Sequence, residues 1–263
     1  CNAKFGVDPN VEMLPMWIAD MDFKAPEEVV EAVTERAAHG VYGYIINRTD
    51  SFVTSIQSWI RRRYGWEVKP EWILFTPGVI PGFNVAYQTF TDPGDGIIVQ
   101  TPIYYPFMDG IRNNRRTMVL NQLLENDGYY TMNFEELQQQ VQDPANKILI
   151  MANPHNPTGR CWTAEELTRL GDLCADNGVL TICDEIHADL IMAGAKHCSM
   201  GSLSEKILQN TIFCYAPSKT FNLAGLQTAF VVIPNDDVRE KFAQGLTANR
   251  IINMNWFGQV ALE

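Results

Sequence analysis

The chain has 263 residues, of which 46% are hydrophobic and 19% are charged. This length and composition are typical of a globular protein and allow one large domain or one and a half. Its 20 basic and 31 acidic side chains give a formal net charge of −11, which argues against nucleic acid as a partner. There is no stretch of about 18 apolar residues and no signal-peptide pattern, so we expect no membrane contact and a cytoplasmic location. The six cysteines form no C-x-x-C pair, so neither a zinc site nor disulfides are indicated.

Two helices are predicted in the first quarter of the chain. The first has Pro26 at its first helical position and stops at Gly40. The second carries an apolar face that includes Phe52 and Ile56, and it is followed by the basic run Arg61–Arg63. Basic side chains complement the dipole at a helix C-terminus, so we interpret this run as a solvated helix end.

Short apolar runs then alternate with helical patterns. Five runs are continuous rather than alternating, as in strands that are covered on both faces: Gly96–Gln100, Lys147–Met151, Val179–Cys183, Ile212–Cys214 and Ala229–Ile233. Between the second and third of these runs, Thr163 to Asn177 has a Thr-Ala-Glu-Glu start and ends at Gly178, which predicts a helix. The order of elements predicts an α/β fold with no interior domain boundary before about residue 240.

In such sheets ligands bind outside the carboxyl ends of the strands, and the loops there carry candidate groups. After Lys147–Met151 comes the loop Ala152–Gly159, whose two prolines make it stiff. Asn156 can therefore present its amide at a fixed place, and the Asn156–Pro157 bond is a candidate for the cis form. Asp184 follows the next strand. A buried carboxylate there needs a partner, which could be a protonated ring nitrogen, an arginine or a backbone cap.

Two more loops at strand ends could contact a ligand. The run Trp72–Thr76 is followed by Pro77–Gly82, where glycines and the start of a helix would suit a phosphate group. Gly96–Gln100 is followed by Tyr104 and Tyr105, whose rings could stack on a flat ligand or simply pack.

Lys219 follows the strand predicted at Ile212–Cys214 and is flanked by turn-forming residues rather than by a carboxylate. A lysine near the interior loses its proton readily and can form a Schiff base with a carbonyl group. The alternative is an ordinary surface lysine at a strand end.

Four segments in this order resemble one family: Leu14–Phe23, Ala152–Arg160, Asp184–His187 and Ala216–Leu226. Asn156 and Asp184 are 28 positions apart, and Asp184 and Lys219 are 35 apart. From about Met13 to its last residue the chain resembles fold-type I pyridoxal-phosphate enzymes of the class I/II aminotransferase superfamily. It is most similar to the branch of cystathionine β-lyases, the carbon-sulfur β-lyases.

The resemblance implies a role for each matching residue. Lys219 would hold pyridoxal 5′-phosphate as a Schiff base and transfer protons, and Asp184 would pair with the pyridinium nitrogen. Asn156 would donate to the ring hydroxyl oxygen. Tyr104 would stack on the ring, with His187 alongside. The phosphate would be held by four residues: Gly78, Val79, Ile80 and Ser218.

The resemblance also implies an architecture. Residues 1–40 would be an N-terminal arm and first helix, and residues 41–263 a large three-layer α/β/α domain with a mostly parallel central sheet. A smaller C-terminal domain, which carries the arginine for the substrate carboxylate, is expected after Glu263. Tyr44 would reach the phosphate of a partner subunit, which predicts a homodimer.

Two positions depart from many members of the superfamily. Ala216 stands where a hydroxyl is common, and Gln227 where an arginine is common. Both changes favour the lyase branch. The activity expected is α,β-elimination from an S-substituted L-cysteine such as cystathionine, which yields pyruvate, ammonia and a thiol. The alternatives are an amino-acid aminotransferase and a cofactor-binding regulatory or interaction protein.

Overall fold

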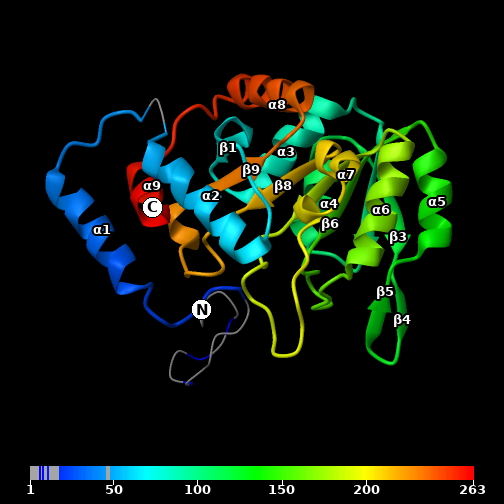
Figure 1. Cartoon of the computed structure of the whole chain (residues 1–263), viewed down its shortest axis with the longest axis horizontal. Coiled ribbons are helices and arrows are strands. Elements are labelled where there is room, and N and C mark those ends of the chain that lie inside the picture. The colour runs from blue at the N-terminus through cyan, green and yellow to red at the C-terminus, as the bar shows by residue number, and fades with distance from the viewer. Residues whose placement is uncertain (1–5, 7, 9–10, 12–17, 46–47) are drawn as a thin grey trace.

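A seven-stranded sheet forms the centre of the computed structural model, which describes residues 6, 8, 11, 18–45 and 48–263 (Figure 1). Its strands lie in the order β1-β9-β8-β7-β6-β2-β3. They are β1 (Ile73–Thr76), β2 (Gly96–Thr101), β3 (Thr117–Gln122), β6 (Asn146–Ala152), β7 (Leu180–Asp184), β8 (Thr211–Tyr215) and β9 (Ala229–Val232). A separate antiparallel hairpin consists of β4 (Leu124–Asn126) and β5 (Tyr129–Thr131).

The strand directions bring the candidate loops together. β2, β3, β6, β7 and β8 pair in parallel, as in Ile150 opposite Ile182 and Cys183 opposite Phe213. β9 runs antiparallel to β8 and to β1, so β1 has the same direction as β8. The carboxyl ends of β1, β2, β6, β7 and β8 therefore meet at one edge of the sheet.

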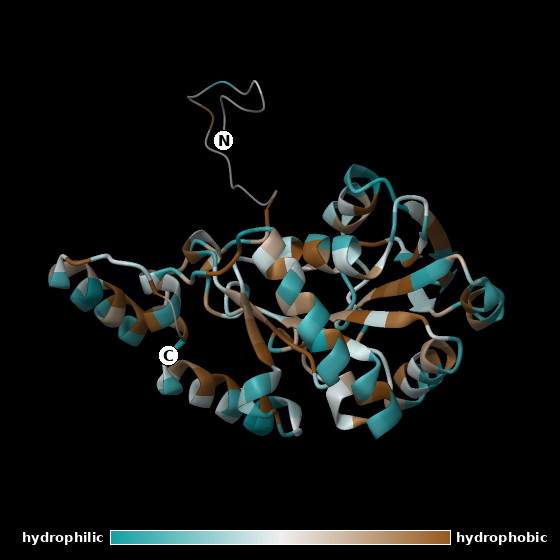
Figure 2. Cartoon of the chain, turned by 90° about the horizontal axis from the view of Figure 1, so that it is seen from above, coloured by the Kyte–Doolittle hydropathy of each residue, from teal (hydrophilic) through white to brown (hydrophobic). Residues whose placement is uncertain are grey.

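Helices cover both faces of the sheet, because side chains of successive strand residues point to opposite faces. Ile148 and Ile150 pack with the helices α3 (Val79–Phe90), α4 (Tyr105–Asn113) and α8 (Asp236–Ala248). Leu149 and Met151 pack with α2 (Asp50–Tyr64), α5 (Phe134–Gln142), α6 (Ala164–Asp176) and α7 (Glu205–Gln209). The result is a three-layer α/β/α arrangement, with apolar residues facing the interior (Figure 2).

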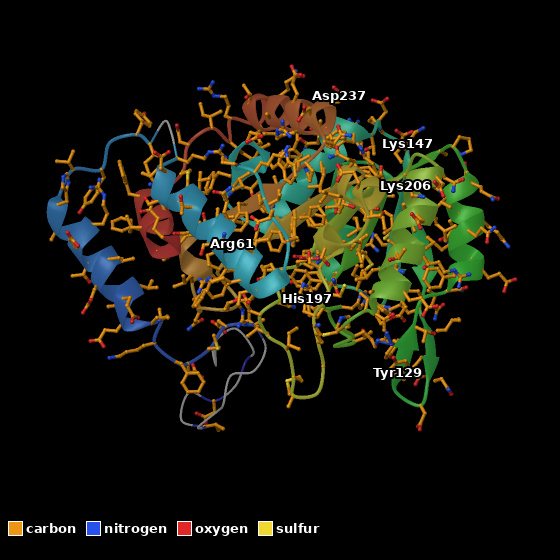
Figure 3. All side chains as sticks on the ribbon, in the orientation of Figure 1. Arg61, Tyr129, Lys147, His197, Lys206 and Asp237 are labelled. Carbon is orange, nitrogen blue, oxygen red and sulfur yellow. The ribbon has the colours of Figure 1, made fainter. Side chains whose placement is uncertain are left out.

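At one end of the molecule α1 (Glu27–His39) packs against α9 (Trp256–Leu262), and α1 buries none of its own residues (Figure 1). The described residues also include three short 3₁₀ helices: η1 (Pro70–Trp72), η2 (Met200–Ser202) and η3 (Ala224–Leu226). Charged side chains such as Arg61, Lys206 and Asp237 lie on the outside of the helical layers, and Lys147 is exposed at the start of β6 (Figure 3). In the described part of the chain no helix is both long and apolar enough to cross a membrane.

The α/β fold and all five predicted strands are confirmed. The helix predicted from Thr163 is α6, where the Thr163 hydroxyl accepts from the Glu166 amide and the Glu166 side chain accepts from the Thr163 amide. Arg61–Arg63 form the last turn of α2, as expected. The predicted helical position of Pro26 was wrong by one residue, because its ψ of 146° makes it the N-cap of α1 rather than the first helical residue. β3 was not predicted, since its edge position leaves half its residues exposed and interrupts the apolar pattern.

Candidate active site

A cavity of about 630 Å³ lies where the loops after β1, β2, β6, β7 and β8 meet. Nine of the ten candidate residues line it: Gly78, Val79, Ile80, Tyr104, Asn156, Asp184, His187, Ser218 and Lys219. Tyr105, the second ring considered for stacking, also lines it, together with several residues that were not predicted from the sequence: Ile18, Ala19, Pro81, Phe107, Ala152, Pro154 and Ile186. Residues that are distant in sequence thus form one concave site at the position typical of ligands in α/β sheets.

Asp184 is the last residue of β7, and its side chain is buried at the base of the cavity. The Ile186 amide donates to its Oδ1 at 3.0 Å. Burial raises the pKa of this carboxyl to about 7, and the nearby Lys219 amine only partly opposes the shift. No cation among the described residues forms an ion pair with Asp184, so a positively charged ligand group would be favoured there.

Asn156 lies in a loop whose backbone is fixed at both ends. His155 donates its amide to the Arg160 carbonyl at 2.7 Å, and Gly159 donates to the His155 carbonyl at 2.8 Å. A ring nitrogen of His155 lies 2.8 Å from the Pro102 carbonyl oxygen, which connects this loop to the loop after β2. The Asn156–Pro157 bond is cis, as predicted, and so is the Asn153–Pro154 bond.

The start of α3 faces the cavity with Gly78 as its N-cap. No side chain caps this end, and the first turn contains no acidic residue. The amides of Val79 and Ile80 precede the first hydrogen-bonded turn of the helix, so they are available to an anion, which the helix dipole also attracts.

Lys219 reaches the cavity from a tight turn after β8. The turn is closed by two backbone hydrogen bonds, from Phe221 to Pro217 and from Leu223 to Ser218, each 3.0 Å long. The Lys219 amine donates to the Ala19 carbonyl at 2.9 Å. Among the described residues, its nitrogen is therefore held at the cavity wall by a neutral acceptor and not by a carboxylate.

Aromatic rings form the remaining wall. Tyr104 is 38% exposed, and its ring packs edge-to-face on Phe107 at a centroid distance of 5.7 Å. His187 lies on the opposite loop, where burial and the Lys219 charge lower the pKa of its imidazole. A neutral imidazole at this place can donate or accept a hydrogen bond without adding charge.

Tyr44 is the one candidate outside the cavity. Its ring is 86% exposed, although the backbone around it is fastened to the C-terminal region. Ile45 pairs with Met254, and the Trp256 indole donates to the Gly43 carbonyl at 2.7 Å. The segment Leu14–Phe23 is described only from Ile18 onward, so Leu14–Trp17 and Met13 lie outside the described residues.

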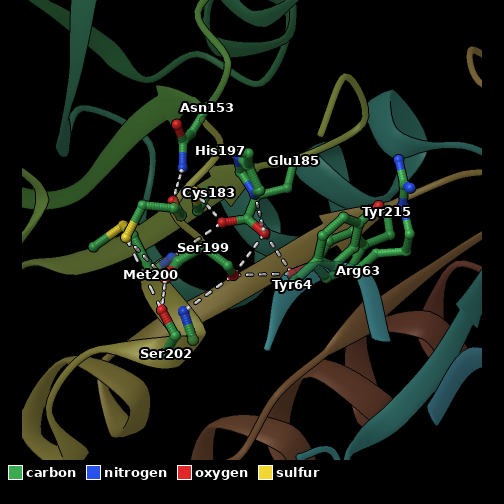
Figure 4. A network of polar contacts seen from close by, with 12 residues as sticks. Arg63, Tyr64, Asn153, Cys183, Glu185, His197, Ser199, Met200, Ser202 and Tyr215 are labelled. Carbon is green, nitrogen blue, oxygen red and sulfur yellow. Dashed lines mark hydrogen bonds and ion pairs between the residues drawn. The ribbon is translucent and has the colours of Figure 1, made fainter. Parts of the chain in front are cut away.

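A buried polar network around Glu185, next to Asp184, supports the site (Figure 4). This network was not predicted from the sequence. Glu185 is 1% exposed and accepts hydrogen bonds from Tyr215 at 2.5 Å and Ser199 at 2.8 Å. Its other oxygen accepts from the Met200 amide at 3.1 Å, and His197 Nε2 lies 3.6 Å from the carboxylate. The signal in the sequence was the pair of successive acids at the end of β7: Asp184 faces the cavity, and Glu185 anchors the strand end.

A second network fixes the other side of the Lys219 turn. Asp189 accepts hydrogen bonds from Trp59 at 3.1 Å and from Tyr64 at 2.9 Å, and Arg63 pairs with it at 3.0 Å. Thr220, next to Lys219, also donates to Asp189, at 3.2 Å. The lysine is therefore carried by a turn tied to α2.

The cavity suits a ligand with three different groups. The buried Asp184 favours a cation, and the uncapped amides of Val79 and Ile80 favour an anion. The Lys219 amine could bond to a carbonyl carbon. Pyridoxal phosphate has a ring nitrogen, a phosphate and an aldehyde, so these residues fit the expected cofactor.

The sequence matches the aminotransferase class I and II family over residues 12–250, and the chain belongs to this family. It is 44% identical over 259 residues to cystathionine β-lyase PatB of Bacillus subtilis, an alignment that covers 98% of the chain. Cystalysin of Treponema denticola, whose crystal structure contains pyridoxal 5′-phosphate, has a TM-score of 0.95 at 37% identity over 99% of the chain. A C-S lyase of Staphylococcus hominis, also with this cofactor bound, has a TM-score of 0.86 at 32% identity over 94%.

The chain spans 66% of the length of the first two of these proteins and 62% of the third. The resemblance to the aminotransferase superfamily and its carbon-sulfur lyase branch, inferred from four short segments, is thus confirmed over nearly the whole chain.

The buried Asp184 predicts a pH dependence of stability in the cofactor-free protein. The pKa is about 7 in the folded chain, and the unfolded value is near 3.8, so between these pH values the folded state holds the extra proton. The free energy of unfolding contributed by this group therefore falls as pH rises through that range. Asp184→Asn removes the titration. We expect the stability of the variant relative to wild type to rise by about 2 kcal/mol between pH 5 and pH 8.

Urea unfolding of both proteins at the two pH values measures this difference. All other titrating groups are shared, so they cancel in the comparison. A constant difference would mean that Asp184 is already ionised in the folded chain at pH 5.

Proposed function

We propose that this chain provides the cofactor site of a pyridoxal-phosphate-dependent carbon-sulfur lyase. The observation that carries the proposal is the convergence of Lys219, Asp184, Asn156 and the start of α3 on one cavity. The names of the relatives support the reaction class, since PatB is a cystathionine β-lyase and the Staphylococcus hominis protein is a C-S lyase. The substrate proposed is an S-substituted L-cysteine such as cystathionine.

Lys219 would have two tasks. Its amine would anchor the cofactor, and once freed by the substrate it would take the proton from Cα of the amino acid. The thiolate would then leave Cβ with the electrons of the C–S bond and be protonated to a thiol. Water would release pyruvate and ammonia from the remaining unsaturated amine. The bound cofactor supplies the electron sink that makes the Cα proton acidic.

The neighbouring residues would orient the reacting groups. Asp184 would keep a proton on the ring nitrogen, because its buried carboxylate gains most from a cationic partner. Asn156 would donate its amide to the ring hydroxyl oxygen from its fixed loop, Tyr104 would stack on the ring, and His187 would lie alongside.

The phosphate would be held chiefly by neutral donors. Ser218 and the amides of Val79 and Ile80 line the cavity, whereas Ala216 and Gln227 do not. Gln227 adopts a left-handed conformation (φ 46°) at the end of η3. Hydrogen bonds from backbone amides and the dipole of α3 would therefore offset the charge that many superfamily members meet with an arginine.

The lyase proposal predicts the products. The enzyme containing this chain, incubated with cystathionine and cofactor, should release pyruvate and thiol in equal amounts without an added keto acid. Lys219→Ala should lower the rate by roughly 10²–10⁴-fold, as expected for loss of a general base. Lys241→Ala, at an exposed position on α8, is the matched control and should retain activity.

The two alternatives give different results in the same assay. An aminotransferase would transfer the amino group only when a keto acid is supplied, and it would release no thiol. A regulatory protein would bind the cofactor without turnover of either kind.

We further propose that the working enzyme is a cytoplasmic homodimer in which Tyr44 completes the partner's phosphate site. Two observations support this proposal. The backbone on either side of Tyr44 is held by hydrogen bonds at Gly43 and Ile45, and the Tyr44 side chain is 86% exposed. Val41 and Tyr42 beside it are 64% and 55% exposed, so the segment presents a small apolar surface.

Subunit mixing tests this arrangement. A mixed dimer of Lys219→Ala and Tyr44→Ala subunits has one site that lacks both residues and one site that has both. Each variant alone should be weakly active, and random mixing should restore about one quarter of wild-type activity, because half of the dimers are mixed and each has one complete site. Activity equal to the average of the two parents would mean that Tyr44 and Lys219 do not serve the same site across the interface.

A further inference from the structure

The segment Ile18–Phe23, here called the strap, begins at the cavity wall beside Lys219. Ile18 and Ala19 line the cavity, and the strap then leads toward α1 along the lower edge of the body (Figure 1). It is neither helix nor strand. Its backbone groups therefore have no ladder or helical partners, and its position depends on hydrogen bonds to other parts of the chain.

Asn222 supplies three such hydrogen bonds. Its Nδ2 donates to the Met21 carbonyl at 2.7 Å and to the Phe23 carbonyl at 2.9 Å. Its Oδ1 accepts from the Met21 amide at 3.1 Å. An asparagine amide has two donor hydrogens and one acceptor oxygen, so this side chain is fully used by the strap.

The backbone at Asn222 favours this residue type. Its φ is 58°, in the left-handed region, which asparagine and aspartate tolerate better than other side chains with a Cβ. Asn222 lies three residues after Lys219, in the same hydrogen-bonded turn. The turn thus positions two side chains toward the strap: the Lys219 amine at Ala19 and the Asn222 amide at Met21 and Phe23.

The two contacts would respond differently to cofactor binding. If Lys219 held an aldehyde as a neutral Schiff base, its ammonium would give one proton to solvent, and its two remaining hydrogens would leave with the aldehyde oxygen as water. Nζ would then have no hydrogen to donate to Ala19. The three Asn222 bonds involve no reacting atom and can persist.

We propose that Asn222 is a positioning residue that keeps the strap at the cavity wall after Lys219 has exchanged the Ala19 carbonyl for the cofactor. The strap then presents Ile18 and the Ala19 carbonyl to the substrate as a fixed wall of the binding site. The replacement of the Lys219–Ala19 hydrogen bond by a bond to the cofactor rests on the proposed function. The hydrogen bonds between Asn222 and the strap do not rest on it, since they are present in the cofactor-free chain.

Amide hydrogen exchange of the peptide 18–24, followed by mass spectrometry, tests the proposal with and without pyridoxal phosphate. Wild type should protect the Met21 amide in both states. Asn222→Ala should exchange this peptide at least tenfold faster in both states, because it loses the acceptor of the Met21 amide. Asn222→Asp keeps that acceptor and the tolerance for positive φ, but it lacks both donor hydrogens and turns a carboxylate toward the Met21 and Phe23 carbonyls, so it should also exchange faster than wild type, by a smaller factor. Asn249→Ala, which removes an exposed side-chain amide at the C-cap of α8, is the matched control.

Lys219→Ala separates the two contacts. Its strap should remain protected, because the Asn222 bonds are intact. If the strap of Lys219→Ala exchanged as fast as that of Asn222→Ala, Lys219 rather than Asn222 would be the residue that fixes the strap. Wild-type protection of the strap in both Asn222 variants would overturn the proposal. If wild type binds no cofactor, the proposed function fails, while the cofactor-free comparison still decides the role of Asn222.

Steady-state kinetics of the loaded enzyme give a second readout. Asn222→Asp should raise KM for cystathionine about tenfold or more and leave the visible absorbance band of the bound cofactor unchanged, since the strap contacts substrate rather than cofactor. Loss of the band would show that the substitution disrupts the cofactor site itself and would contradict a positioning role.

Discussion

The burial of Asp184 is the constraint on which the rest of the site depends. A carboxyl group at the end of a central parallel strand is removed from water, and its pKa rises to about 7 because the charged form loses solvation. The chain does not relieve this cost with an ion pair among its described residues. It leaves the group facing a cavity, with the Ile186 amide as the hydrogen-bond donor, and in the proposed function a cationic group of the ligand completes the site.

The surroundings keep this destabilising group in place. Glu185, the next residue, is buried behind the strand end and satisfied by Tyr215, Ser199 and the Met200 amide. Asp189, four residues further on, is tied to α2 and to the turn that carries Lys219. Three carboxylates within six positions therefore have separate functions: one remains available to a ligand, and two fix the scaffold. Such an arrangement is consistent with a preorganised site whose charged groups do not need to move on binding.

Much of the fold and the cavity could be predicted from the sequence, and the reason is physical. Parallel strands covered on both faces are continuous apolar runs, so β2, β6, β7, β8 and β9 were all recognisable. Because the carboxyl ends of such strands share an edge, Asn156, Asp184 and Lys219 could be expected to meet although they are 28 and 35 positions apart. The edge strand β3 and the hairpin β4–β5 lack that continuous pattern and were missed.

The contacts that orient the site could not be predicted. The partners of Glu185 and Asp189 are set by packing between elements that lie far apart in sequence. The Asn222 bonds to the strap span about 200 positions and depend on one residue adopting a positive φ, which no periodic pattern reveals. Tyr44 shows the opposite case, since a residue assigned by resemblance lies outside the cavity of its own chain and acquires a role only in the proposed dimer.

Chemical trapping tests the central claim, that Lys219 anchors a cofactor held by Asp184 and the start of α3, more directly than any other measurement. The protein is loaded with pyridoxal phosphate, reduced with borohydride so that any C=N bond becomes a stable amine, digested and mapped by mass spectrometry. One modified peptide is expected, with the pyridoxyl phosphate group on Lys219. Modification of a different lysine, or equal labelling of several surface lysines, would contradict it.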